Sequence, residues 1–340
     1  MNTLKIEKEL HQTYNIYNEE KYNKFIFSDK SYDVYSNVNL SIFVDKYCNY
    51  KCPFCVADQR QDNRSCNLTN EEYLSRLKYV LDYIEPLNPT VSLTGGEPTK
   101  SELLIPIIKL LDSYNFKRRT ITTNGAGLLD RYEDKLIIDR LIEANFNYIN
   151  ISRLHYNEDI NRDLVVPTKD YLLNKDLEYI LKNYKSGSKY NSRIRLSAVL
   201  LKEGVNSVNE ISNYINYFSK FEQDSFIFRQ LMLPDNFVTS SKKSYTKDNF
   251  VALSDIYKDF GEDFELYKEI HGYYYTVKIF SNKGNNIATE YADLAVSYSE
   301  NENHKDLIYE MVFHPNGNLT KNWQESENIL MKYNTNEGSN

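Results

Sequence analysis

The stretch that decides the fold of this 340-residue chain is Cys48-Asn49-Tyr50-Lys51-Cys52-Pro53-Phe54-Cys55. It holds three of the four cysteines, and the fourth, Cys66, follows closely. A disulfide framework would join distant segments, whereas crowded thiols indicate a metal ion or an iron-sulfur cluster. Structural zinc normally takes four protein ligands in paired CxxC units, and no second Cys or His pair lies at such a spacing nearby. Three thiolates around a 4Fe-4S cube would leave the fourth iron open to a small molecule.

Short β-branched strands alternate with amphipathic helices outward from this stretch. A strand is expected at 38–44, and the capping-box residues Thr69 and Glu72 begin the helix that follows. Further strands are expected at 90–94, 119–122, 148–152, 193–201 and 225–231, and further helices at 101–113, 133–144, 169–184 and 207–219. Such alternation pairs the strands in parallel with the helices outside. We predict an α/β fold, a partial (β/α)6 barrel of the TIM type.

Three domains are expected: an N-terminal segment (1–36), the core barrel (37–234) and an α+β C-terminal extension (235–340). The extension contains no cysteine and begins with a polar stretch, 240–248, that reads as a linker. Within it, the Asn316-Gly317 pair between two short strands predicts a hairpin.

Polar turns follow the second, third and fourth expected strands. They read Thr94-Gly95-Gly96-Glu97-Pro98-Thr99, Thr122-Thr123-Asn124-Gly125 and Ser152-Arg153. Two glycines allow a ligand to approach the backbone closely, and Glu97 can accept a hydrogen bond from an ammonium group. A GGxP turn taken alone is also an ordinary connection between a strand and a helix. Because parallel barrel strands end at one common mouth, we expect these turns to converge on the ligand of the cysteine loop.

With these motifs the chain resembles the radical S-adenosylmethionine (SAM) enzymes. Cys48, Cys52 and Cys55 match the CxxxCxΦC signature of that family. The resemblance implies that they hold a 4Fe-4S cluster, that the methionine part of SAM chelates the fourth iron, and that Phe54 lies against the adenine. One electron from the cluster would then cleave SAM to methionine and a 5′-deoxyadenosyl radical. The alternative from the residues alone is a zinc knob or inert thiols.

The same resemblance assigns the contacts of SAM. The segment Gly95-Gly96-Glu97-Pro98 matches the GGEP motif, which holds the methionine amino group. Thr122, Asn124 and Ser152 match residues that contact the ribose and the methionine carboxylate. Leu200, on the fifth expected strand, would back the adenine or simply pack in the core.

From about residue 37 to 232 the chain resembles the branch that contains the GTP cyclases of molybdenum-cofactor biosynthesis. Those enzymes carry a second, cysteine-ligated cluster that binds substrate, and no cysteine follows Cys66 here. We therefore expect one cluster and no GTP cyclisation by that mechanism. The segment 313–323 resembles the hairpin that opens the cluster-bearing SPASM extension of peptide-modifying relatives, so the extension reads as a degenerate one that has lost its metal.

Four residues near the expected barrel mouth are candidates for substrate contact or catalysis. Arg153 and Arg229 could hold a carboxylate or phosphate, or could neutralise a neighbouring acid. His155 and Tyr156 could touch substrate, although a lone histidine is usually structural. Cys66 could return a hydrogen atom to a product radical, or could simply be a packed thiol.

The main interpretation is an enzyme whose deoxyadenosyl radical abstracts hydrogen from a small polar metabolite or nucleotide in a biosynthetic pathway. An electron donor such as flavodoxin or ferredoxin is implied. Only residues 1–36 precede the first barrel strand, which favours a small molecule over a ribosomal peptide, and the cysteine loop also resembles that of the viperins, which act on nucleotides. The alternatives are a peptide maturase and, in another class, an iron-sulfur sensor or zinc-binding module.

The composition of the chain limits its expected partners and location. The chain has 41 Lys and Arg residues against 48 Asp and Glu, a net charge of -7, which disfavours a nucleic-acid partner. It has no apolar run of membrane-spanning length and no signal-peptide pattern at its start, so we expect a cytoplasmic protein that contacts no membrane.

Overall fold

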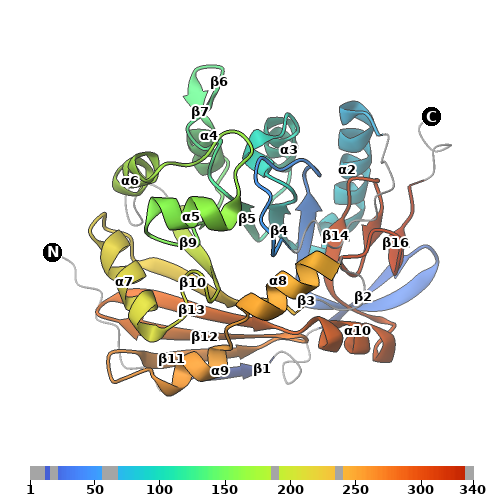
Figure 1. Ribbon diagram of the computed structural model, residues 1–340. Coiled ribbons are helices and arrows are strands. Elements are labelled where there is room, and N and C mark those ends of the chain that lie inside the picture. Colours follow the sequence, from blue (N-terminus) through green and yellow to red (C-terminus); the bar gives the residue numbers. More distant parts are fainter. Residues whose placement is uncertain (1–11, 16–21, 56–67, 185–190, 234–239, 334–340) are drawn as a thin grey trace.

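The computed structural model describes residues 12–15, 22–55, 68–184, 191–233 and 240–333 (Figure 1). Six neighbouring parallel strands form the centre of its sheet. In spatial order they are β3 (Lys30–Phe43), β4 (Thr90–Thr94), β5 (Arg118–Thr123), β8 (Tyr148–Ser152), β9 (Arg193–Leu200) and β10 (Ser225–Gln230). Among the described residues this sheet does not close on itself, so the expected α/β fold with a partial (β/α)6 barrel is confirmed.

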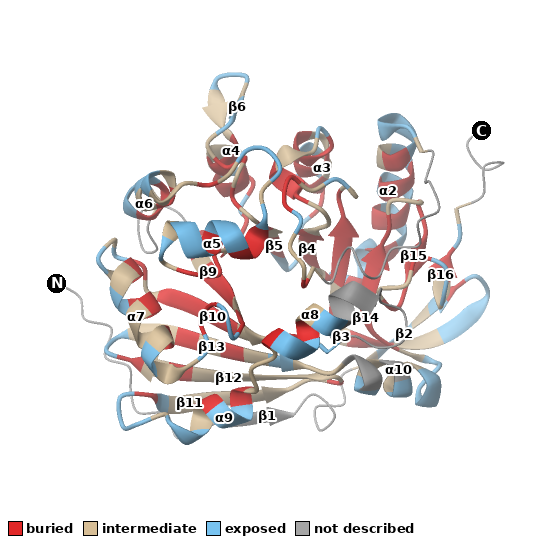
Figure 2. Cartoon of the chain, in the orientation of Figure 1, coloured by how far each residue is buried: buried red, intermediate tan, exposed pale blue. Residues whose placement is uncertain are grey.

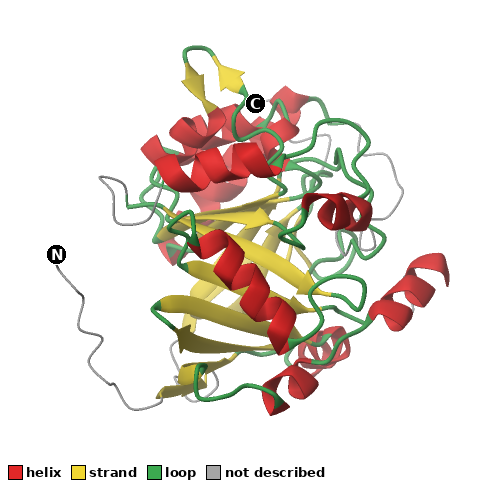
Figure 3. Ribbon diagram, turned by 60° about the vertical axis from the view of Figure 1, so that its left-hand side comes forward, coloured by secondary structure: helices red, strands yellow, loops and turns green. Residues whose placement is uncertain are grey.

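Helices connect the strands and cover the outer face of the sheet (Figures 1 and 3). They are α2 (Asn70–Ile84), α3 (Leu104–Leu111), α4 (Ile137–Glu143), α5 (Glu158–Val165), α6 (Asn174–Asn183) and α7 (Val208–Ser219). In α2, Leu77, Leu81 and Ile84 are fully buried, at the three- and four-residue spacing that gives a helix one apolar face. The predicted capping box is present, since Thr69 and Glu72 each accept the other's backbone N–H. Figure 2 shows the resulting buried layer between strands and helices.

The local structure departs from the sequence expectations at several places. The helix expected at 133–144 begins with a small hairpin, β6 (Arg131–Tyr132) and β7 (Lys135–Leu136), whose turn places Glu133 in the left-handed region at φ 57°. Between the strand expected at 148–152 and the helix expected at 169–184, where no element was expected, the chain forms α5, which the side chain of Asn157 caps by accepting two backbone N–H groups. The stretch predicted as a linker forms α8 (Ser240–Asn249), so that prediction was wrong.

Strands from the C-terminal part extend the barrel sheet at both edges. At one edge β13 (Asn285–Ala292) runs parallel to β10 and is followed by the antiparallel strands β12 (Tyr275–Asn282) and β11 (Glu265–His271). At the other edge β14 (Leu307–Phe313) runs parallel to β3. The remaining elements are β1 (Gln12–Asn15), β2 (Tyr22–Phe27), β15 (Leu319–Thr320), β16 (Ile329–Met331), α9 (Leu253–Lys258), α10 (Leu294–Asn303) and the 3-10 turns Glu85–Leu87 and Pro98–Lys100.

Tyrosine side chains connect the strands added at the two edges of the barrel sheet. Tyr273, in the turn between β11 and β12, stacks on Tyr309 of β14 with ring centroids 4.4 Å apart. Both pack with Tyr35 of β3 in one buried cluster. The predicted hairpin is present: β14 pairs with β15 in antiparallel, and Gly317 takes the positive φ of 78° that the turn requires. No described helix is both long and apolar enough to cross a membrane.

Candidate active site

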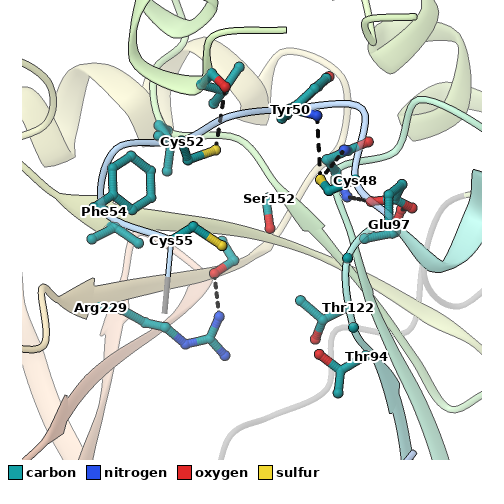
Figure 4. Close-up of a pocket in the computed structure, with 18 of the residues that line it drawn as sticks. Cys48, Tyr50, Cys52, Phe54, Cys55, Thr94, Glu97, Thr122, Ser152 and Arg229 are labelled. Carbon is teal, nitrogen blue, oxygen red and sulfur yellow. Dashed lines mark hydrogen bonds between the residues drawn. The ribbon is translucent and has the colours of Figure 1, made fainter. Parts of the chain in front are cut away.

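A cavity of about 300 Å³ lies at the C-terminal ends of the parallel strands. Residues from five separate segments that the sequence singled out meet in its wall, as the common mouth of a parallel barrel requires. Those predicted residues are Cys48, Cys52, Phe54, Cys55, Gly95, Gly96, Glu97, Thr122, Asn124, Ser152 and Arg229. Figure 4 shows the three cysteines, Glu97, Thr122, Ser152 and Arg229 around a shared space.

The cysteine loop is held in place by its backbone. Lys51 donates its N–H to the carbonyl of Val166 at 3.0 Å, and Thr168 donates to the carbonyl of Asn49 at 2.8 Å. These bonds tie the loop to the segment between α5 and α6. All three thiols in it are half-buried and free of disulfides. Within the described residues, no three Cys, His, Asp or Glu side chains are already gathered around a single metal position.

The glycine turn packs directly against the backbone of the cysteine loop. Gly96 donates its N–H to the carbonyl of Asp45 at 2.7 Å, and Glu97 donates to the carbonyl of Tyr47 at 2.8 Å. A Cβ on Gly96 would lie 1.9 Å from the Tyr47 oxygen, and Gly95 has φ +138°. Only glycine fits both positions, so the turn and the loop have one fixed relation.

Glu97 is a buried carboxylate that joins two turns. Its Oε1 accepts hydrogen bonds from the backbone and hydroxyl of Thr99, at 2.9 and 2.5 Å, and from the hydroxyl of Thr123. Its Oε2 accepts from the backbone N–H of Asn124 at 2.6 Å. Burial raises the pKa of Glu97, and these hydrogen bonds act in the opposite direction because they stabilise the charged form. Oε2 accepts one described donor, which leaves it room for a second.

Asn124 links the third strand to the cysteine loop. Its side-chain amide donates to the Oδ1 of Asn49 at 2.8 Å and lies 4.0 Å from the sulfur of Cys48. Burial raises the pKa of the Cys48 thiol to about 11. Binding of a metal or cluster at Cys48 must therefore displace a firmly held proton.

Leu200 and Pro98 do not line the cavity. Leu200 is fully buried on the same face of β9 as Leu196 and Ala198, in the layer under the helices. Side chains alternate between the faces of a strand, so its neighbour Val199 is the one that lines the cavity. Pro98 is buried at the start of the 3-10 turn that follows Glu97.

Three of the four catalytic candidates also lie outside the cavity wall. Arg153 is 1% exposed and donates to the Tyr171 hydroxyl, to the Leu172 carbonyl and to the side chain of Asn174. It therefore fastens the segment that leads into α6. His155 lies 3.4 Å from Glu210 of α7 and stacks on Tyr156 at 4.3 Å. These two rings pack against α7, where Tyr156 also contacts the ring of Tyr217, and burial lowers the pKa of His155.

Arg229 is the catalytic candidate that reaches the cavity. It donates from Nη1 to the Ser197 hydroxyl at 2.7 Å, and its Nε lies 3.2 Å from a carboxylate oxygen of Glu290 on β13. Figure 4 shows the guanidinium beneath Cys55. Sequence reasoning missed Ser197, Val199, Leu231 and Met232 as lining residues. Alternation along β9 could have identified the first two.

Glu290 and Cys66 mark two limits of the sequence reasoning. Glu290 comes from a strand that no motif indicated, so no sequence signal paired it with Arg229. Cys66 lies outside the described residues.

Comparison with known proteins places this geometry in context. A family model described as the Radical SAM superfamily matches residues 43–214. The chain is 27% identical over 176 residues to a probable GTP 3′,8-cyclase of Sulfurisphaera tokodaii, covering 52% of this chain and 51% of the cyclase. It is 28% identical over 182 residues to a probable GTP 3′,8-cyclase of Thermococcus kodakarensis, covering 54% and 53%. The chain thus spans about half the length of these relatives.

A solved structure shares the fold. Streptococcus suis SuiB superposes on 84% of this chain and 60% of its own, with a TM-score of 0.50 and 16% sequence identity. At that identity the likeness concerns the fold alone.

Proposed function

Because this chain belongs to the radical SAM superfamily, and is thus an enzyme, we propose that it uses one 4Fe-4S cluster to abstract hydrogen from a small polar metabolite or nucleotide. The observation that carries the proposal is the convergence of three cysteines, the glycine turn and Glu97 on one cavity. A partner that donates single electrons, such as flavodoxin or ferredoxin, completes the proposal.

The residues present suit the cluster and SAM that the family implies. Cys48, Cys52 and Cys55 offer three soft ligands, and the described residues add no fourth cysteine, which suits a cluster with one open iron. The backbone of Gly95 and Gly96 lines the cavity beside them. When bound and reduced, the cluster supplies the electron that splits SAM into methionine and a 5′-deoxyadenosyl radical.

The chain's own groups would bind and orient SAM. Glu97 offers Oε2 to the methionine ammonium, and its other bonds fix that oxygen against the turn of Asn124. Thr122 and Ser152 present hydroxyls from neighbouring strands.

Apolar side chains packed beside this space would help to keep water from it. Phe54 packs with Leu154, Val165 and Leu231 and stacks on Tyr245 of α8 with centroids 6.4 Å apart. Exclusion of water protects a reactive intermediate from side reactions.

Iron analysis tests the single cluster. Anaerobically reconstituted protein should carry about four irons per chain, the content of one such cluster. Joint replacement of Cys48, Cys52 and Cys55 by Ala should abolish binding, whereas Cys66→Ala should retain it. About eight irons per chain would contradict a single cluster.

Isotope transfer tests the substrate class. The hydroxyls of Thr122 and Ser152 and the guanidinium of Arg229 in the cavity wall favour a polar substrate. The relatives named GTP 3′,8-cyclase are consistent with a nucleotide. A deuterated nucleotide or metabolite that transfers deuterium into 5′-deoxyadenosine would support the proposal. Transfer from a deuterated peptide alone would favour the second candidate, a peptide maturase.

A further inference from the structure

The inner face of the barrel is polar below the cavity. Many barrels fill this space with branched apolar side chains, but here hydroxyl and amide groups run across it. Thr120 donates to Ser92 at 2.9 Å, and Ser92 donates to Asn39 at 2.8 Å. On the next strands Asn150 approaches Thr122 at 3.4 Å. Such a lining suits a polar ligand better than a packed core.

Arg195 stands on this inner face. It lies two residues before Ser197 and four before Val199, so all three share one face of β9, and the latter two line the cavity. Because β9 runs toward the mouth, Arg195 lies deeper in the barrel than they do. Its Nε donates to Oδ1 of Asn150 at 2.7 Å, and its guanidinium lies 3.9 Å from the centroid of the Tyr148 ring.

The charge of Arg195 lacks a carboxylate partner. Across the described parts of the chain, no Asp or Glu oxygen lies within 4.0 Å of its nitrogens. Burial lowers its pKa to about 10, and the nearby positive charges of Arg229 and Arg118 act in the same direction. Charges removed from water are normally paired, so a half-buried guanidinium without a directly paired carboxylate on this wall points to a missing anion.

Arg229 adds a second guanidinium to the same wall. Its strand β10 is hydrogen-bonded to β9, and its Nη1 reaches down to Ser197, the residue between Arg195 and the mouth on that face. Glu290 lies 3.2 Å from Arg229 and also acts electrostatically on Arg195. One carboxylate therefore serves two guanidiniums, and the wall keeps a net positive charge.

We propose that Arg195 and Arg229 together bind an anionic group of the substrate, a carboxylate or a phosphate, inside the barrel below the SAM cavity. This inference rests on the proposed function and narrows its substrate class. Planar guanidiniums suit both oxyanions because they donate two parallel hydrogen bonds. The bound end of the substrate would then lie deep in the barrel, with its other end toward the mouth.

Anion titration of the reconstituted, SAM-loaded protein tests the proposal. Inorganic phosphate and sodium acetate are titrated separately by calorimetry, so the two arms separate a phosphate from a carboxylate site. Arg195→Gln should weaken binding of the preferred anion about tenfold or more, because charge-assisted bonds are lost. Arg131→Gln, at an exposed arginine bonded to the Asp134 carbonyl, is the matched control and should bind as the wild type does.

A second variant is expected to change anion binding in the opposite direction. Glu290→Gln removes the carboxylate that competes for Arg229 and should tighten anion binding severalfold. Damage to the fold would weaken it instead. Equal binding in the wild type and Arg195→Gln, binding of neither anion to the wild type, or weaker binding in a Glu290→Gln protein that is as stable as the wild type would overturn the proposal. Absence of iron or of SAM cleavage in the wild type would instead count against the proposed function, whatever the titration gives.

Discussion

Two parts of the molecule meet at the cavity and are built in different ways. The cofactor turns (45–55, 94–99 and 122–125) are locked to one another through backbone bonds, two glycines without room for a Cβ, and the four donors around Glu97. The wall of β9, β10 and β13 presents Arg195, Arg229 and Glu290, whose charges do not balance. Backbone geometry thus fixes the cofactor turns, while side chains from distant segments give the wall its charge.

The largest expected effect comes from filling the contact between two cofactor turns. Gly96→Ala would place a methyl group 1.9 Å from the backbone oxygen of Tyr47. The clash can be relieved only if the cysteine loop moves. We expect the free energy of unfolding to fall by about 4 kcal/mol or more and iron binding to be lost. Urea unfolding and iron analysis measure both.

Gly261→Ala is the control, because nothing lies within 4 Å of a Cβ at that position. A Gly96→Ala variant as stable as the control would show that the turns are not locked in this way.

Removing the buried carboxylate should have the next largest effect. Glu97→Ala leaves the hydroxyls of Thr99 and Thr123 and the N–H of Asn124 without their acceptor, so stability should fall by about 2 to 3 kcal/mol. Loss of the ammonium partner should also weaken SAM binding about tenfold or more. Glu102→Ala, at an exposed acid just after the same turn, should change neither. A Glu97→Ala variant with wild-type stability and wild-type SAM affinity would show that Glu97 neither locks the cofactor turns together nor binds SAM.

The C-terminal hairpin provides a smaller effect with a defined pH dependence. His314 is 1% exposed and bonds the Thr320 hydroxyl at 2.9 Å, and burial lowers its pKa to about 4. A histidine with a lowered pKa stabilises the fold above its unfolded pKa of about 6.5 and loses that contribution as the pH falls toward 4. By pH 5 the loss should be about 2 kcal/mol.

Unfolding measured at pH 7.5 and pH 5 in the wild type and in His314→Asn tests this directly. The variant should show a weaker fall in stability between the two pH values, whereas His304→Asn, at an exposed histidine, should follow the wild type. Parallel falls in all three proteins would mean that His314 does not carry the effect.

The sequence identified the cofactor turns because their chemistry is local. Cysteine spacing, glycine pairs and polar residues at strand ends depend on a few neighbouring positions, and the barrel rule brings those ends together. For Arg153 and Leu200 the sequence predicted the right segment but the wrong direction of the side chain. Arg153 points toward α6, and Leu200 points to the outer face of β9, next to Val199 on the inner face. The alternation of side chains along a strand tells which residues face the cavity only when it is known which face of the strand packs in the core.

Partners across the sheet were beyond sequence reasoning. Glu290 reaches Arg229 because β13 adds to the edge of β10, and Tyr273 reaches Tyr309 because the two sheet edges approach. Neither pair of residues has a fixed spacing in the sequence that could have indicated the contact. The helix α8 was missed because its sequence is almost wholly polar, and its packing at Tyr245 against Phe54 is a tertiary contact.

The most direct test of the account is the fate of SAM on the reduced, reconstituted protein, followed by mass spectrometry. If the cofactor turns hold the cluster and SAM as proposed, wild-type protein releases 5′-deoxyadenosine and methionine, and the variant with Cys48, Cys52 and Cys55 all replaced by Ala releases neither. Intact SAM after incubation with iron-loaded wild type, or S-adenosylhomocysteine as the main product, would contradict it.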